Sequence, residues 1–262
     1  VAVSLWSFSR SLFRDVTPWL APLLFAATPA FLETAILYTN DLHLALYTLI
    51  TAYCFFLWNR RPEPRLLVLT GLCAGICLGI KYTALLCVLM PLCCGIWWTT
   101  IREHRAGTGE AMRRTCWCLL PALLIFMPWL VKNLIATGNP LYPGLYGLLG
   151  GKNLSAVQYA SIAMMSHPPS LQQMVTGLWE HPVRLCIEPR VQPLAGEWHV
   201  GPLLLIALPL WLVVRPASPR IKILCAAGIL MFLSWNCTFN VARFLYPCIV
   251  LLLPGAAYFI QK

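Results

Sequence analysis

Residues 130–143, LVKNLIATGNPLYP, divide the chain into two unequal parts. The stretch ends an apolar run at Lys132 and Asn133, and Gly138-Asn139-Pro140 then breaks the helix. Mostly polar sequence follows until the next apolar segment begins at Gly201. The other connections between apolar runs are short. Most of the residues outside the membrane therefore lie on one side of it.

The composition is that of a membrane protein, with 59% hydrophobic and only 11% charged residues. Soluble domains carry about 25% charged residues. Several separate apolar runs predict an all-α, polytopic transmembrane helix bundle in place of a single water-soluble globule. We expect about eight spans, at residues 17–32, 42–58, 66–80, 83–99, 116–131, 200–214, 223–236 and 244–260.

The net charge of +10 does not indicate a nucleic-acid partner, because the basic residues fall at the ends of apolar runs and form no single patch. If the N-terminus lies inside and successive spans alternate in direction, most of the 19 Lys and Arg residues fall on the inner side, which has the short loops. This is the positive-inside pattern. It predicts an integral membrane protein with the large loop on the periplasmic or extracellular side.

Three regions follow from this topology. Residues 1–132 form an N-terminal transmembrane bundle of about five spans, residues 133–199 an extracytoplasmic loop subdomain, and residues 200–262 the C-terminal spans. The twelve cysteines lie mostly in apolar runs, where cysteine acts as a small hydrophobic residue. Since no CxxC pair occurs, we predict no metal site from cysteine.

Two short helices are expected inside the large loop, at Leu154–Met165 and Ser170–Trp179, with Ser155 and Ser170 as N-caps. We expect both helices to lie at the membrane interface over the bundle. An irregular arm should follow, passing through the prolines at 182, 189 and 193.

Asp41 is the leading candidate for a catalytic residue. It opens the second span within Tyr38-Thr-Asn-Asp-Leu-His43. A carboxylate at a helix N-terminus that faces a cavity can act as a general base or hold a base in place. Glu33 is a weaker candidate of the same kind. The alternative is that Asn40 or Asp41 simply caps the helix.

Lys81, Lys132 and Arg243 each lie at the outer end of a span, and Tyr82 adds a hydroxyl beside Lys81. Cations at this position often extend only to the interface. Three of them on the side that the positive-inside rule disfavours also suggest a shared anion. We therefore predict that these four residues bind the phosphate of a lipid carrier.

Four local patterns resemble bacterial membrane glycosyltransferases of the GT-C fold class, which include protein O-mannosyltransferase-like and aminoarabinose-transferase-like enzymes. TGNPLYP is the most specific, within a pattern that begins at Pro128-Trp-Leu-Val-Lys-Asn133. The other three are Tyr38-Thr-Asn-Asp-Leu-His-Leu-Ala-Leu-Tyr47, Gly71-Leu-Cys-Ala-Gly75 through Gly79-Ile-Lys-Tyr-Thr-Ala-Leu-Leu86, and Arg243-Phe-Leu-Tyr-Pro247.

The resemblance implies transfer of a sugar from a polyprenyl-phosphate carrier to a lipid, glycan or protein acceptor at the outer membrane face. Asp41 matches the second acidic position of that family, and Lys81 and Arg243 fall where cations would hold the lipid phosphate. A requirement for a divalent metal stays open. The family's first outer loop, with its principal acid, has no counterpart here. We expect that the N-terminus is truncated; an inactive GT-C relative is the alternative.

A second class of function is a polytopic transporter or lipid flippase without transferase activity. Such proteins usually place polar groups near the middle of the membrane and often contain repeated halves. Here the spans are almost free of ionisable residues, and the polar groups collect on one face. An oxygen-antigen-type ligase or polymerase would have a large loop richer in arginine and histidine. These contrasts favour the transferase.

Overall fold

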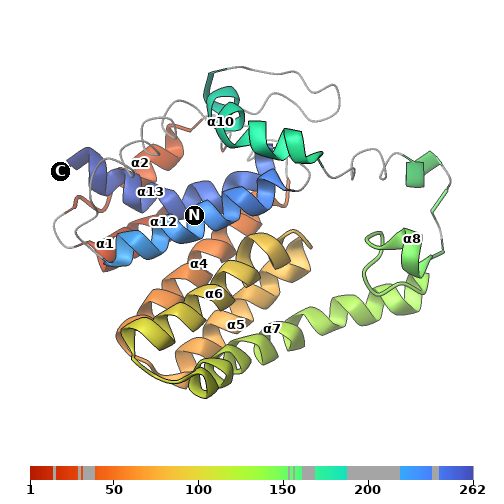
Figure 1. Ribbon diagram of the computed structural model, residues 1–262, viewed down its shortest axis with the longest axis horizontal. Coiled ribbons are helices and arrows are strands. Elements are labelled where there is room, and N and C mark those ends of the chain that lie inside the picture. The colour runs from red at the N-terminus through yellow and green to blue at the C-terminus, as the bar shows by residue number, and fades with distance from the viewer. Residues whose placement is uncertain are drawn as a thin grey trace.

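The computed structural model describes residues 1–13, 16–28, 31, 39–152, 154–155, 157–160, 169–187, 219–237 and 242–261. Within these ranges every regular element is a helix, which confirms the predicted all-α fold (Figure 1). The elements are α1 (Ala2–Leu12), α2 (Leu20–Ala26), α4 (Asp41–Arg60), α5 (Pro64–Ile80), η1 (Leu85–Leu89), α6 (Met90–Trp98), η2 (Thr99–Glu103), α7 (Thr108–Thr137), α8 (Tyr146–Leu149), α10 (Leu171–Ile187), α12 (Pro219–Asn236), η3 (Ala242–Leu245) and α13 (Tyr246–Gln261).

Three described helices are long and apolar enough to cross a membrane: α4, α7 and the continuous segment Leu85–Glu103 made of η1, α6 and η2. Shorter apolar helices are α5, α13 and Ile221–Asn236 of α12. Each of these helices overlaps a predicted span, but the span expected at 17–32 contains only the seven-residue helix α2 within its described residues. The span expected at 200–214 lies outside the described residues.

Helices α5 and α7 pack with their backbones in close contact. A Cβ atom on Gly71 would lie 2.1 Å from the carbonyl oxygen of Cys118, and one on Gly75 would lie 2.5 Å from the carbonyl oxygen of Ala122. Glycines one turn apart let apolar helices approach closely, and the contact energy comes from van der Waals packing. Pairing with α5 therefore fixes the long helix α7 relative to the rest of the bundle.

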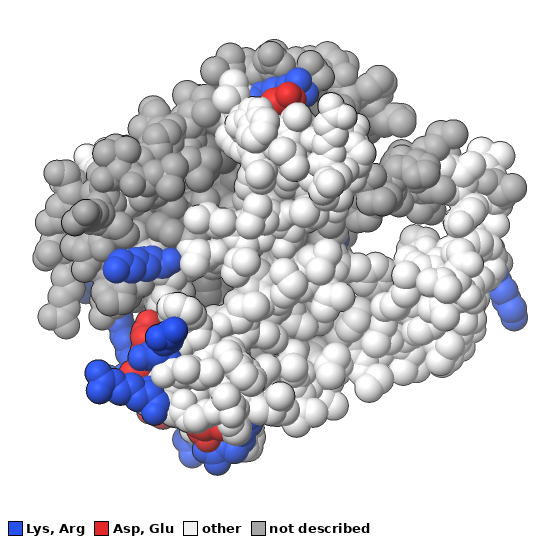
Figure 2. All heavy atoms as spheres, in the orientation of Figure 1, with Lys and Arg blue, Asp and Glu red and all other residues white. Residues whose placement is uncertain are grey.

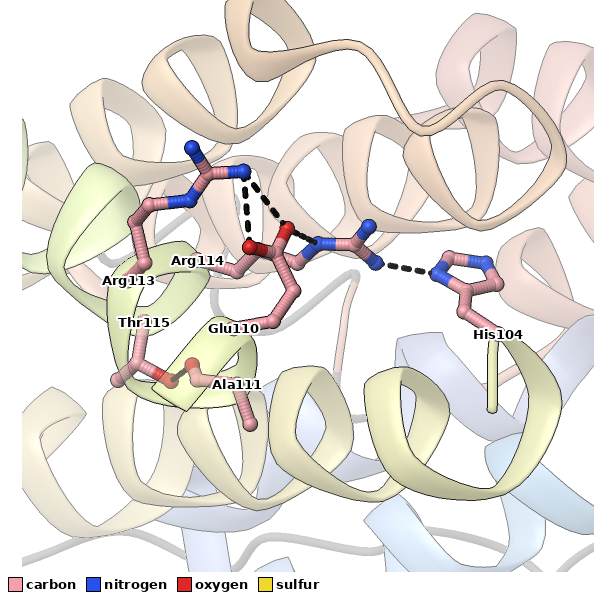
Figure 3. A network of polar contacts seen from close by, with 6 residues as sticks. All are labelled: His104, Glu110, Ala111, Arg113, Arg114 and Thr115. Carbon is pink, nitrogen blue, oxygen red and sulfur yellow. Dashed lines mark hydrogen bonds and ion pairs between the residues drawn. The ribbon is translucent and has the colours of Figure 1, made fainter. Parts of the chain in front are cut away.

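One end of the bundle is rich in arginine, and we call it the arginine end. Arg114 on α7 donates to Glu110 at 2.6 Å and to Nδ1 of His104 at 2.5 Å (Figure 3). Because arginine can only donate, Nδ1 is the acceptor and the ring proton lies on Nε2, 3.3 Å from the Asn59 carbonyl oxygen. Figure 2 shows Lys and Arg side chains gathered over this α6–α7 corner.

The opposite end, which we call the loop end, holds the start of α4, the α5–η1 corner and the end of α7. Gly138 terminates α7 in a left-handed conformation with φ of 80°, as the Gly-Asn-Pro sequence predicts. The helix thus continues through position 132, the last residue of the expected N-terminal region, as far as Thr137.

Helix α1 is one element that hydropathy alone does not predict, because serines and Arg10 interrupt its apolar residues. Leu5 and Phe8 are fully buried, and the Phe8 ring lies 5.6 Å from that of Phe56 on α4. The helix is amphipathic and joins the core through one face.

Both predicted N-caps of the large loop are confirmed. Ser155 and Gln158 exchange hydrogen bonds of 3.2 and 3.0 Å between side chain and backbone, and Ser170 does the same with Gln173 at 3.3 and 2.8 Å. Each is a capping box. Helix α10 continues past Pro182 to Ile187, so the irregular arm expected at Pro182 is wrong. The other two prolines of the arm lie outside the described residues.

Candidate functional site

A partly buried ion pair joins the first residue of α4 to the residue that caps the end of α5. The Nζ atom of Lys81 lies 2.7 Å from Oδ1 of Asp41, and their side chains are 23% and 3% exposed. Asn40 occupies the N-cap position but makes no side-chain capping hydrogen bond. Asp41 is thus oriented toward Lys81 at the positive end of the helix dipole, where its negative charge is favoured.

Lys81 is held from a second side by η3. Its Nζ atom lies 3.3 Å from the ring centroid of Phe244. A cation over an aromatic face is attracted by the ring's negative quadrupole, and more strongly where water is excluded. Three segments that are distant in sequence therefore meet at one ammonium group: the start of α4, the end of α5 and η3.

The α5–η1 corner is as short as the sequence predicts. Lys81 leaves the helix in an extended conformation with φ of −158° and ψ of 131°, and its carbonyl oxygen accepts from the amide of Ala84 at 3.0 Å. The chain thus reverses within the residues that carry the Lys81 and Tyr82 side chains. This reversal sends the two side chains to different neighbours.

The Tyr82 hydroxyl connects the corner to α7 and to the start of the large loop. It accepts hydrogen bonds from Nε1 of Trp129 at 2.9 Å and Nδ2 of Asn133 at 2.8 Å. It donates to the carbonyl oxygen of Tyr142 at 3.0 Å. A phenol hydroxyl has one donor and two acceptor positions, so all are used. In this conformation the group has no proton left to offer a phosphate.

Asn139 organises the TGNPLYP segment. The residue is fully buried, and its Nδ2 donates to the carbonyl oxygens of Gly144 and Gly150, both at 3.0 Å. Its Oδ1 accepts from the amide of Leu141 at 2.9 Å. One side-chain amide thus satisfies backbone groups across the whole turn. The segment is a compact loop that rests on α7 and on Tyr82.

Of the remaining predicted site residues, the structure describes only Lys132 in full. Lys132 lies on the exposed side of α7 with its Nζ 4.1 Å from the Trp129 ring centroid. Trp129 in turn donates to Tyr82, which links Lys132 to the corner. The backbone of Arg243 lies in η3 directly before Phe244, but its side chain is outside the described residues, as is the whole of Glu33.

A cavity of about 440 Å³ lies between α4, the segment Leu85–Glu103 and α12. Its lining is mostly apolar, as is typical of a site for a hydrophobic ligand. Thr48, about two helical turns beyond Asp41 on α4, marks the end nearer to the ion pair. Glu103 and Lys222 lie at the arginine end.

The arrangement supplies the elements of an acid–base site beside a hydrophobic compartment. The carboxylate of Asp41 lies on α4, which also lines the apolar cavity, and the cation comes from Lys81 at the end of α5. Trp129, Asn133 and Phe244 are residues of the site that sequence reasoning did not select. All three lie within the quoted motifs, but none is ionisable, so a search for charged groups passes over them.

Comparison with known proteins covers the half of the chain that contains this ion pair. No curated protein and no solved structure matches the chain. The family model for dolichyl-phosphate-mannose-protein mannosyltransferase matches residues 1–132, which hold Asp41, Lys81, Tyr82 and Lys132 but not the TGNPLYP loop or η3. The chain therefore belongs to the dolichyl-phosphate-mannose-protein mannosyltransferase family, a family of membrane glycosyltransferases.

Proposed function

We propose that this protein transfers a sugar, with mannose as the first choice from the family's name, from a polyprenyl-phosphate carrier to a hydroxyl group of an acceptor. The Asp41–Lys81 ion pair, with Asp41 buried and Lys81 partly buried, is the observation that carries the proposal. Within a matched transferase family, a carboxylate and an ammonium group 2.7 Å apart at one end of the bundle supply both charges that the reaction needs.

In the proposed reaction, the acceptor oxygen attacks the anomeric carbon of the sugar. The bond between that carbon and the lipid-phosphate oxygen breaks, and its electron pair leaves with the phosphate. The Asp41 carboxylate takes the proton from the attacking hydroxyl as general base. The Lys81 ammonium stabilises the negative charge that develops on the leaving phosphate. A new glycosidic bond and a free polyprenyl phosphate are the products.

The other predicted residues have supporting roles in this proposal. Arg243 and Lys132 add positive charge for the phosphate, and Glu33 is a second acid near the start of α4 in sequence. The apolar cavity between α4, α6 and α12 receives part of the polyprenyl chain. We further propose that the loop end faces the periplasm or the extracellular space, because the arginine-rich end is the one that the positive-inside rule keeps in the cytoplasm.

The test is transfer of radiolabelled mannose from polyprenyl-phosphate mannose to a serine- and threonine-containing peptide by the full-length protein in vesicles. Asp41→Asn should lower kcat by about 100-fold or more, the usual contribution of a general base. Lys81→Gln should raise KM for the donor and lower kcat. Glu63→Gln, an exposed acid at the arginine end, is the matched control and should leave both constants unchanged. Full turnover by Asp41→Asn would overturn the assignment.

A further inference from the structure

Helix α10 exposes an apolar stripe that nothing in the described bundle covers. Leu171 is 78%, Val175 47%, Leu178 42% and Trp179 58% exposed. At 3.6 residues per turn, positions 171, 175 and 178 share one face and Trp179 lies beside it. The stripe therefore runs along the first half of the helix, and Val183, 47% exposed, lies beyond Trp179.

The polar residues of α10 occupy a different side. Glu180 and Arg184 form an ion pair of 2.8 Å along the helix, and Thr176 and Gln173 lie on the same side. Gln173 also closes the capping box with Ser170. The helix thus has a polar side and an apolar side, with both largely turned away from the bundle.

A third, narrow side attaches α10 to the end of α12. Nδ2 of Asn236 donates to the Met174 carbonyl oxygen at 2.7 Å, and the ring of His181 packs edge-on against that of Trp235 with centroids 5.1 Å apart. Gly177 lies between them, where a Cβ atom would come within 2.4 Å of Oδ1 of Asn236. Because this contact fixes the rotation of α10 about its own axis, the apolar stripe cannot turn into the bundle.

The contact with α12 indicates how deep the apolar stripe lies relative to the membrane. Asn236 is the last residue of the apolar helix α12, and a helix of that kind ends where the hydrocarbon core of a membrane gives way to head groups. Figure 1 shows α10 lying along the edge of the bundle beside the blue helix α12. If α12 crosses the membrane, the stripe lies at the height of the lipid interface.

We infer that α10 binds the membrane surface as an amphipathic helix, with Leu171, Val175, Leu178 and Trp179 inserted at the boundary between head groups and acyl chains. A tryptophan at the edge of the stripe suits this boundary, which favours an apolar ring with a polar N–H. A stripe on one 17-residue helix is small for a stable protein partner, which buries about 800 Å² on each side. The inference is independent of the proposed transferase activity.

Photocrosslinking in the full-length protein tests this placement. A benzophenone amino acid replaces Leu178 in one variant and Thr176, on the opposite side of α10, in the matched control. Both proteins are reconstituted into vesicles of phosphatidylcholine and phosphatidylglycerol and irradiated, and adducts are identified by mass spectrometry. We expect severalfold more phospholipid adducts from position 178. Equal yields at the two positions, or adducts with a second copy of the chain, would overturn the inference.

A second measurement avoids the bulky probe. Tryptophan fluorescence of the wild-type protein and of Trp179→Phe is compared in vesicles with and without phospholipids brominated near the glycerol end of the acyl chain. We expect the wild type to show an additional quenched component that the variant lacks. The same quenched fraction in both proteins would place Trp179 outside the bilayer.

Discussion

Asp41 and Lys81 lie 40 residues apart in the chain, yet their side chains form a partly buried 2.7 Å ion pair at the loop end. The contact joins the start of one helix to the end of the next, and Phe244 of η3 covers the ammonium group. The proposed catalytic charges are thereby also structural, and experiments must separate the two roles.

Neutralising one member of the pair should destabilise the protein more than neutralising both. Asp41→Asn or Lys81→Met alone leaves a mostly buried charge without its partner, at a cost of about 3 kcal/mol in the free energy of unfolding. The combination Asp41→Asn with Lys81→Met removes both charges and should regain most of that loss. Thermal unfolding of the purified protein in detergent measures the difference. Additive losses in the double variant would contradict a direct pairing.

Activity should not return with stability in this double variant. If the pair had only a structural role, the uncharged double variant would transfer sugar at a rate near that of the wild type. If the charges carry out the chemistry as proposed, transfer stays lost although the protein folds.

Tyr82→Phe should reduce stability more than it reduces donor binding. The change leaves the exposed Trp129 N–H and a buried Asn133 N–H without their acceptor, and an unsatisfied buried donor costs about 1–3 kcal/mol. Because the hydroxyl's own proton is used by Tyr142, KM for the donor should change little. The melting temperature and donor KM are measured together. A large rise in KM at an unchanged melting temperature would favour the sequence-based prediction of a phosphate contact.

Gly71→Ala should weaken the packing of α5 on α7, whereas Gly79→Ala should not. A methyl group at Gly71 collides with the backbone of Cys118, but at Gly79 nothing lies within 4 Å. We expect a loss of about 1–3 kcal/mol for the first variant and a change within about 1 kcal/mol for the second, where alanine favours the helix. Comparable melting temperatures for the two variants would show that the helices are not in backbone contact.

The contact between α10 and α12 should loosen at acidic pH. Burial, followed by the charge of Arg184, lowers the pKa of His181 below its usual value of 6.5. The docked state therefore prefers the neutral ring, and docking is full above pH 6.5 and weakens as the pH falls below it. The protection factors of the α10 amides, which compare each exchange rate with the intrinsic rate at the same pH, measure this loss of docking at pH 7.5 and 5.5. In the control, His181→Phe keeps a ring beside Trp235 but cannot titrate. The protection factors of α10 in this variant should therefore be the same at both pH values.

Local sequence signals predict much of the fold. Apolar runs locate the helices, Gly138 ends α7, and the two serine caps start helices where the Ser-x-x-Gln spacing places them. These features depend on residues within a few positions of one another. Helix α1 escapes prediction because its burial depends on Phe56 and other residues contributed by distant helices. The continuation of α10 past Pro182 is likewise not evident from propensity.

The candidate site is only partly visible in the sequence. Asp41 and Lys81 are recognisable as ionisable residues at helix ends, but their contact depends on how α4 and α5 pack. The role of Tyr82 depends on Trp129 and Asn133, which approach it from α7 across about 50 residues of chain. Such long-range contacts leave no periodic pattern in a single sequence.

The lengths of two helices match the thickness of a membrane. Helix α4 runs 20 residues from Asp41 to Arg60, which is about 30 Å. On α7, Arg114 packs against Trp58 near one end, and Asn133 bonds to Tyr82 at the other, again about 30 Å apart along the helix. Both lengths equal the hydrocarbon thickness of an ordinary bilayer, about 30 Å.

If α4 crosses the bilayer along its normal, Asp41 and Lys81 lie at the plane where acyl chains end and head groups begin. A phosphate on a membrane-embedded lipid occupies that same plane without leaving the bilayer. In a thinner membrane the pair would stand clear of the lipid, and in a thicker one it would be submerged. With that orientation, the length of α4 makes access to the ion pair depend on the thickness of the bilayer.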